Sequence, residues 1–167
     1  MSAAPFDDRD GSIWLDGSLI DYRDAKIHVL SHGLHYASAV FEGERLYNGS
    51  IFKSQEHTDR LLKSANVVGY EIPYSVEEIE KAKLQVVEAM ELIDGYVRPI
   101  AWRGTEMMGV SAQQNKIHLA ITAWDWPSYF DPEAKTKGIN LALSKWRRPA
   151  PDTAPTNSKA SGLYQIC

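Results

Sequence analysis

HGLHYASAVFEG, residues 32–43, is the stretch that decides the fold class. It is apolar but rich in glycine, serine and alanine, so we predict a packed loop followed by a strand rather than a helix. A β-hairpin is predicted on each side of it. Asp16-Gly17 and Asn48-Gly49 each separate two apolar runs, and such dipeptides favour two-residue turns in which both central residues have positive φ. Short paired strands are therefore expected around this segment.

Two helices are predicted after the hairpins. Ser54 is expected to cap the first, and Ser75 with Glu78 makes a capping box for the second, over residues 76–93. The apolar face of the first helix consists of Leu61, Leu62, Ala65 and Val68. The face of the second consists of Val76, Ile79, Ala82, Val86, Val87 and Met90. Asp94-Gly95 is expected to end the second helix.

The remainder of the chain returns to strands. Residues 96–104 and 116–126 are β-rich, residues 139–148 suggest a further strand, and a helix is expected to start at about Lys159. This order of elements predicts the α+β class. We expect a small α+β domain at 1–127, an interdomain linker at 128–138, and the truncated start of a large domain at 139–167.

Composition limits the function. The chain has 167 residues, 44% of them hydrophobic, and a net charge of −4, which argues against nucleic acid as the main partner. Its single cysteine favours a reducing compartment. The N-terminus lacks the features of a signal peptide, and no apolar run approaches the length of a membrane span. We therefore expect a cytoplasmic protein without a membrane partner.

Lys159 is the main candidate for chemistry. By composition alone it is a solvated surface lysine; alternatively, its amine forms a Schiff base with a carbonyl compound. Small residues at 158 and 160–162 would leave room for a bulky aldehyde cofactor, and Tyr164 could donate a hydrogen bond to it.

The histidines and the basic residues have ordinary interpretations. His28, His32 and His35 have a spacing that would suggest zinc on a helix, but Gly33 argues against a helix, and we expect no metal and buried, hydrogen-bonded histidines. Arg60 resembles a surface arginine, and the basic stretch SKWRRP resembles a solvated strand end more than a phosphate site. For the aromatic residues of WDWPSYF, core packing and a pocket wall are equally compatible.

Several stretches together resemble the branched-chain amino-acid aminotransferases, fold-type IV enzymes that use pyridoxal 5′-phosphate. They are VLSHGLHYASAVFEGERLY (29–47), FKSQEHTDRLLKSA (52–65), YVRPIAWRG (96–104), MMGV (107–110) and APTNSKASGLY (154–164). HGLHYASAVFEG with HxxRLxxSA is typical of the fold type. YVRP and the aromatic residues of the linker favour the branched-chain enzymes within it.

The resemblance implies roles for individual residues. Lys159 matches the lysine that binds the cofactor covalently and shuttles the substrate proton. Arg60 matches the arginine that binds the cofactor phosphate, and Tyr164 matches a tyrosine near the cofactor's phenolic oxygen. The matches in the substrate pocket are Phe41, Trp126 and Tyr129 as apolar walls, and Tyr96 and Arg98 as groups that hold carboxylates, Arg98 that of the glutamate side chain.

Other matches concern a second subunit. Tyr36 matches a residue lent across a dimer interface, and Met108 and Val110 match a loop that reaches the partner subunit's site. The resemblance thus implies a homodimer, or an oligomer of dimers, that transfers amino groups between leucine, isoleucine or valine and 2-oxoglutarate. It covers only the front part of such an enzyme, so we expect this chain alone to be inactive. D-amino-acid transaminase and aminodeoxychorismate-lyase activities on the same fold stay open, as does a non-catalytic fragment.

Overall fold

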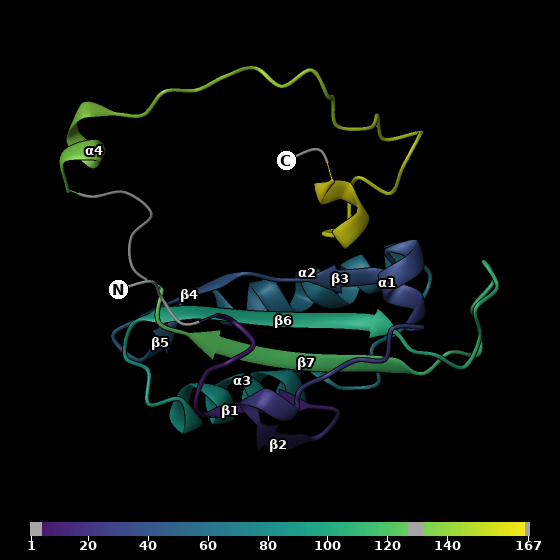
Figure 1. Cartoon of the computed structure of the whole chain (residues 1–167), viewed down its shortest axis with the longest axis horizontal. Helices are drawn as coiled ribbons and strands as arrows, with labels where there is room; N and C mark the ends of the chain where they lie inside the picture. The colour runs from purple at the N-terminus through teal and green to yellow at the C-terminus, as the bar shows by residue number, and fades with distance from the viewer. Residues whose placement is uncertain (1–4, 127–131, 166–167) are drawn as a thin grey trace.

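The computed structural model of the chain describes residues 5–126 and 132–165, and the predicted α+β class is confirmed (Figure 1). An antiparallel sheet has the strand order β2-β1-β7-β6-β4-β5, and β3 also pairs with β6. The strands are β1 (Ser12–Leu15), β2 (Ser18–Asp21), β3 (Ala39–Phe41), β4 (Glu44–Tyr47), β5 (Ser50–Ile51), β6 (Gly95–Arg103) and β7 (Ile117–Trp124). The helices are η1 (Tyr22–Asp24), α1 (His32–Tyr36), α2 (Ser54–Val67), α3 (Val76–Ala89), α4 (Pro132–Lys137) and η2 (Ser161–Tyr164).

Both predicted hairpins are confirmed. Asp16 and Gly17 have φ of 47° and 108° between β1 and β2, and Asn48 and Gly49 have φ of 49° and 76° between β4 and β5. Positive φ at both central residues gives the turn a twist that matches the twist of the strands. The register of these edge strands therefore follows from the two dipeptides.

The helices form with different ends than the sequence predicts. The capping box of Ser75 and Glu78 is present in α3, but the helix ends at Ala89 rather than at residue 93. Glu91 has a φ of 50°, and the Leu92 N–H donates to the Val87 carbonyl, which closes the helix earlier. Ser54 is not a cap: it is the first residue of α2, and the cap position belongs to Lys53, which makes no side-chain capping hydrogen bond.

The main core lies between the helices and one face of the sheet. Alternate residues of β6 and β7 enter it, among them Val97, Ala101, Leu119 and Ile121. Side chains alternate along a strand, so the residues between them lie on the opposite face. Trp102 and Ala120 pack there in a second, smaller cluster. It is this second face that carries the candidate site.

At residues 32–38 the structure differs from the packed loop that the sequence predicts. The segment begins with a short helix, α1, which ends at Ala37 with a φ of 53°. Gly33 lies inside this helix and does not break it. Its role is close packing: a Cβ there would lie 2.9 Å from the Trp102 Cβ. The glycine that argued against a helix thus brings α1 against β6.

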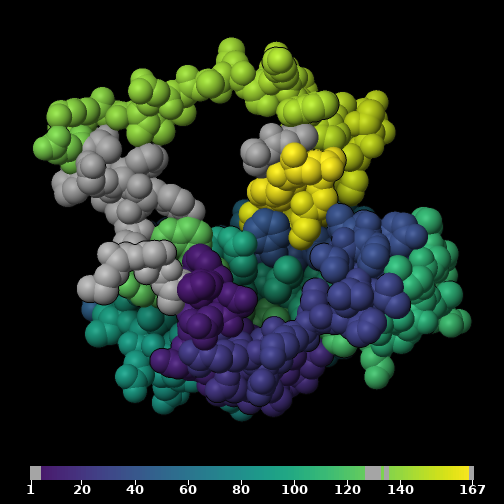
Figure 2. All heavy atoms as spheres, viewed as in Figure 1, coloured from purple at the N-terminus to yellow at the C-terminus, as the bar shows by residue number. Residues whose placement is uncertain are grey.

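The C-terminal segment also differs from the expectation. No ladder strand forms at residues 139–148 within the described chain, and Leu143 is 95% exposed. An apolar strand is stable only beside a strand that accepts its hydrogen bonds, and none of the described strands lies next to it. The segment after α4 instead arches away from the body of the domain and returns at residues 158–164 (Figures 1 and 2). The expected helix is the short η2, which starts two residues after Lys159.

Candidate active site

Lys159 docks on β3 and α2 through its backbone. Its N–H donates to the Ser64 hydroxyl at 2.9 Å, and its carbonyl accepts from the Phe41 N–H at 3.2 Å. The next residue, Ala160, forms an antiparallel bridge with Val40. Ser64 is fully buried in α2, so the lysine is held by a helix and a strand that precede it by about 100 residues in the sequence.

The Lys159 side chain lies between two aromatic groups. Its Nζ donates to the Tyr164 hydroxyl at 2.7 Å and lies 4.3 Å from the centre of the Phe41 ring. The Phe41 and Tyr164 rings are 5.0 Å apart. A lysine amine beside a phenol and over an aromatic ring is oriented by both contacts, which fits the covalent role that the resemblance implies.

Arg98 continues the same face of the sheet. Its guanidinium carbon lies 4.9 Å from the centre of the Phe41 ring, and its Nη2 donates to the Tyr96 hydroxyl at 3.1 Å. The Arg98 Nε is buried and has no acceptor among the residues that the structure describes. A buried donor without an acceptor costs free energy unless a ligand satisfies it. Arg98 is therefore well placed to receive a carboxylate.

Aromatic rings extend from Arg98 toward the linker. Tyr96 lies 4.7 Å from Trp126 and 5.1 Å from Trp124, ring centre to ring centre. Trp126 thus joins the group, whereas Tyr129 lies outside the described residues. Trp124, the first residue of WDWPSYF, was not assigned to the substrate pocket, although it lies two residues before Trp126 and such residues share a face of a strand.

A glycine allows Tyr96 to approach the end of β3. A Cβ on Gly43 would lie 1.7 Å from the Tyr96 hydroxyl oxygen. No side chain fits there unless the tyrosine moves. Gly43 therefore determines where the hydroxyl that contacts Arg98 lies.

Arg60 projects from α2 and binds a buried carboxylate. Its Nε and Nη2 each donate to Glu42 at 2.6 Å, and His57 Nδ1 lies 2.8 Å from the same carboxylate. Burial alone would raise the pKa of Glu42, but the hydrogen bonds from Arg60 and His57 outweigh it, and the pKa lies below its ordinary value. The pKa of Arg60 is raised, chiefly by the hydrogen bond to Glu42, with a smaller electrostatic contribution from Tyr164.

Glu42 and His57 were not predicted as site residues, although the sequence contained a signal for each. His57 and Arg60 are three positions apart and share one face of α2. Glu42 follows Phe41, and successive residues of a strand point to opposite faces. A carboxylate on the helix side of β3 could have been paired with the basic residues of the next helix.

Tyr36, Met108 and Val110 form a separate group. The Tyr36 hydroxyl donates to the Met108 carbonyl at 3.2 Å, and the His32 ring, 4.6 Å from Tyr36, hydrogen-bonds the Gly109 carbonyl. Val110 is 81% exposed. The structure places this group at the loop that follows β6, and connects it to α1 rather than to the contacts of Lys159.

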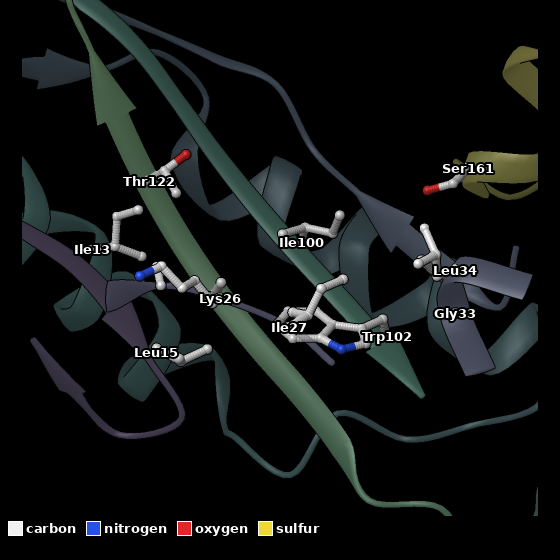
Figure 3. Close-up of a pocket in the computed structure, with 13 residues that line it drawn as sticks. Ile13, Leu15, Lys26, Ile27, Gly33, Leu34, Ile100, Trp102, Thr122 and Ser161 are labelled. Atoms are coloured by element: carbon white, nitrogen blue, oxygen red, sulfur yellow. The ribbon is translucent and has the colours of Figure 1, made fainter. Parts of the chain in front are cut away.

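An apolar pocket of about 410 Å³ lies on the face of the sheet that carries Trp102 (Figure 3). Ile100 and Trp102 of β6 and Thr122 of β7 point toward it, and Ser161 lies at its end near Leu34 (Figure 3). The pocket adjoins the candidate site, because two of its lining residues are strand partners of site residues: Ile100 pairs with Phe41, and Thr122 pairs with Arg98.

The histidines have separate partners. His32 is buried, but His28 and His35 are exposed, so the expectation of burial is wrong for these two. Within residues 5–126 and 132–165, no group of three or more histidine, cysteine or acidic side chains could bind a metal ion. No helix of the described chain has the length and apolar character needed to cross a bilayer.

Comparison with known proteins identifies the family. The model of the amino-transferase class IV family matches residues 39–163. The chain belongs to the class IV aminotransferases. The match spans both the glycine-rich segment at β3 and the segment that carries Lys159, so the resemblance seen in the sequence is confirmed.

Curated relatives of this chain include proteins named branched-chain-amino-acid aminotransferase. The chain is 44% identical over 154 residues to the probable branched-chain-amino-acid aminotransferase of Rickettsia conorii, a match that covers 92% of this chain and 52% of the relative. With the Pseudomonas aeruginosa enzyme it shares 43% identity over 161 residues, 94% of this chain and 52% of the relative. A solved branched-chain amino acid aminotransferase from Thermoproteus uzoniensis, with norvaline, superposes with a TM-score of 0.84 and 35% identity, covering 92% of this chain and 52% of that one. Another solved branched-chain enzyme, with pyridoxamine 5′-phosphate, superposes with a TM-score of 0.88 and 38% identity. The chain thus spans about half the length of these relatives.

Proposed function

We propose that this aminotransferase chain provides the small domain and the catalytic lysine of a transaminase. The reaction transfers amino groups between branched-chain L-amino acids and 2-oxoglutarate, with pyridoxal 5′-phosphate as cofactor. One observation carries the proposal: Lys159 Nζ lies between the Tyr164 hydroxyl and the Phe41 ring, and the same ring is contacted by Arg98, whose buried Nε has no acceptor among the described residues.

The residues present fit the cofactor. When bound, pyridoxal phosphate supplies an aldehyde for the amino group and a ring that stabilises charge on the substrate's α-carbon. Lys159 Nζ is the amine that would hold the aldehyde, with loss of water, and that would take the α-carbon proton once the substrate's amino group has displaced it. Tyr164 would orient the amine through their 2.7 Å hydrogen bond. Arg60, half exposed and always cationic, would bind the phosphate.

The remaining residues account for two kinds of substrate in one site. Phe41, Tyr96 and Trp126 would pack on a branched aliphatic side chain. The buried Arg98 Nε would bind the side-chain carboxylate of glutamate. A lyase of the same fold has little use for this arginine in an aromatic wall, which favours transamination.

A dimer and a cytoplasmic location are part of the proposal. Val110 is exposed on a loop that Tyr36 and His32 hold in place, and such a loop is well placed to complete the site of a partner subunit. The single cysteine and the acidic composition suit the reducing cytoplasm.

Borohydride reduction of the complete protein with bound cofactor, followed by peptide mapping, tests the function. We expect the label on Lys159, and Lys159→Ala should remove it and lower turnover by orders of magnitude. Lys145→Ala is the matched control, since this lysine lies in the exposed segment before the site. A label on Lys145, or full turnover in Lys159→Ala, would contradict the proposal.

A further inference from the structure

Arg60 is held in one orientation by its contacts. Its Nε and Nη2 form a two-pronged pair with Glu42, at 2.6 Å each. No acceptor contacts its Nη1 in the part of the chain that the structure describes, and the side chain is 53% exposed. An arginine that binds a carboxylate with one edge keeps another edge free for a second anion.

Glu42 is a rigid support for this pair. Its side chain is fully buried, its N–H donates to the Pro99 carbonyl at 2.9 Å, and His57 occupies its second oxygen. Arg60, by contrast, has a long and flexible side chain that samples many rotamers when it is unpaired. The fixed carboxylate therefore determines where the guanidinium lies.

Glu42 also connects Arg60 with the rest of the site through the sequence. The neighbouring residue Phe41 contacts Lys159, and the next residue, Gly43, contacts Tyr96. Because Glu42 shares a backbone segment with Phe41, any shift of one moves the other. The contacts of Arg60 with Glu42 and of Phe41 with Lys159 therefore fix the distance between the free edge of Arg60 and the Lys159 amine.

We propose that Glu42 is a positioning residue that orients Arg60, with help from His57, toward a phosphate bound beside Lys159. The proposal rests on the proposed function, in which Arg60 binds the cofactor phosphate. It makes a prediction that simple electrostatics opposes. A nearby carboxylate repels a phosphate, so its removal should tighten binding unless the carboxylate orients the arginine.

The test compares pyridoxal 5′-phosphate with pyridoxal, which lacks the phosphate. Binding of each to the complete protein is followed by quenching of tryptophan fluorescence. The dissociation constant of pyridoxal divided by that of pyridoxal 5′-phosphate measures the phosphate contribution to binding. In Glu42→Gln we expect this ratio to fall about tenfold, the loss of one charge-assisted hydrogen bond. Glu88→Gln is the control, because Glu88 is an exposed carboxylate on α3 and does not line the hollow beside Arg60. It should keep the wild-type ratio.

Each result decides between positioning and its alternatives. A ratio in Glu42→Gln that is unchanged or higher than in the wild type would overturn the proposal. An equal loss for both ligands would also overturn it, because it would show that the pair only connects β3 with α2. A wild-type protein that binds both ligands equally would instead refute the phosphate role of Arg60, and with it part of the proposed function.

A second variant leaves the buried carboxylate intact, in case Glu42→Gln does not fold. Arg60→Lys keeps the positive charge but cannot form the two-pronged pair. We expect it to lose the phosphate preference about tenfold as well, since charge without orientation is not sufficient. A wild-type ratio in Arg60→Lys would show that the pair with Glu42 is unnecessary and would overturn the proposal.

Discussion

Lys83→Met should strongly destabilise the fold. Lys83 is fully buried, and its Nζ is surrounded by Glu44 Oε2 at 2.9 Å, Thr58 Oγ1 at 2.6 Å, Glu80 Oε1 at 2.9 Å and the Ser54 carbonyl at 3.1 Å. Methionine has a similar length and fills the space. The change therefore removes the charge while leaving almost no cavity.

The loss of stability is estimated from the buried Glu44 carboxylate that the substitution leaves unpaired. Glu44 is also fully buried, and its Oε1 already lacks a partner among the described residues. Without Lys83 the carboxylate loses its donor, and removing one member of a buried ion pair costs about 3–5 kcal/mol. The free energy of unfolding, measured in urea, should fall by this amount at pH 8.

The loss should depend on pH. Burial raises the pKa of Glu44 to about 7, although Lys83 opposes this, so the folded state binds a proton more tightly than the unfolded state does. Stability from this group is complete below the unfolded pKa and is lost as the pH rises through the folded pKa. In Lys83→Met the opposing charge is gone, so the folded pKa rises further. Between pH 6 and pH 8 the destabilisation should grow by about 1 kcal/mol.

Two variants control this prediction. Lys81→Met places the same change on the exposed side of α3 and should alter stability by less than about 0.5 kcal/mol. Lys83→Met combined with Glu44→Leu removes both charges and should recover most of the loss. If Lys83→Met at pH 8 stays within about 1 kcal/mol of the wild type, the buried pair is not what stabilises this core, and the reasoning fails.

Three further changes test the site. In the complete protein, Arg98→Ala should slow the glutamate half-reaction about tenfold or more relative to the leucine half-reaction, measured by single-turnover kinetics, since only glutamate offers a side-chain carboxylate; equal losses would mean that Arg98 holds the shared α-carboxylate or only the strand. Gly43→Ala should cost about 1–3 kcal/mol in urea unfolding, because its Cβ would displace Tyr96; unchanged stability would contradict the close contact. A polypeptide of residues 1–167 alone should bind pyridoxal phosphate weakly and transaminate no leucine, because it spans about half the length of its curated relatives and offers the cofactor only the three groups proposed above; tight binding with turnover would refute this.

Local sequence rules predict the parts of the fold that local chemistry determines. The Asp-Gly and Asn-Gly turns and the capping box of α3 satisfy their own backbone groups within a few residues. Ser54 shows where such rules fail. Its hydroxyl and carbonyl face Lys83 on another helix instead of capping α2, and a contact between helices cannot be inferred from cap preferences.

The position of Lys83 in the sequence indicated a buried ion pair that was not predicted. Lys83 lies at helical spacing from Ile79, Val86 and Val87, on the apolar face of α3. A lysine on that face indicates either a long side chain that reaches solvent or a buried partner. The partner, Glu44, is on a strand 39 residues earlier. Pairing across that separation depends on the register of β4 with β6, which the sequence alone does not specify.

Residues of the candidate site could be chosen from the sequence, but their grouping could not. Lys159 was assigned through the resemblance to a known family, yet its position depends on Ser64 of α2 and on the end of β3. The lysine comes after the predicted linker, and all of these backbone anchors come before it. A boundary drawn along the sequence therefore separates the lysine from the elements that hold it. It follows that a substitution in α2, such as Ser64→Ala, reaches the lysine through one 2.9 Å hydrogen bond, although the two residues are 95 positions apart.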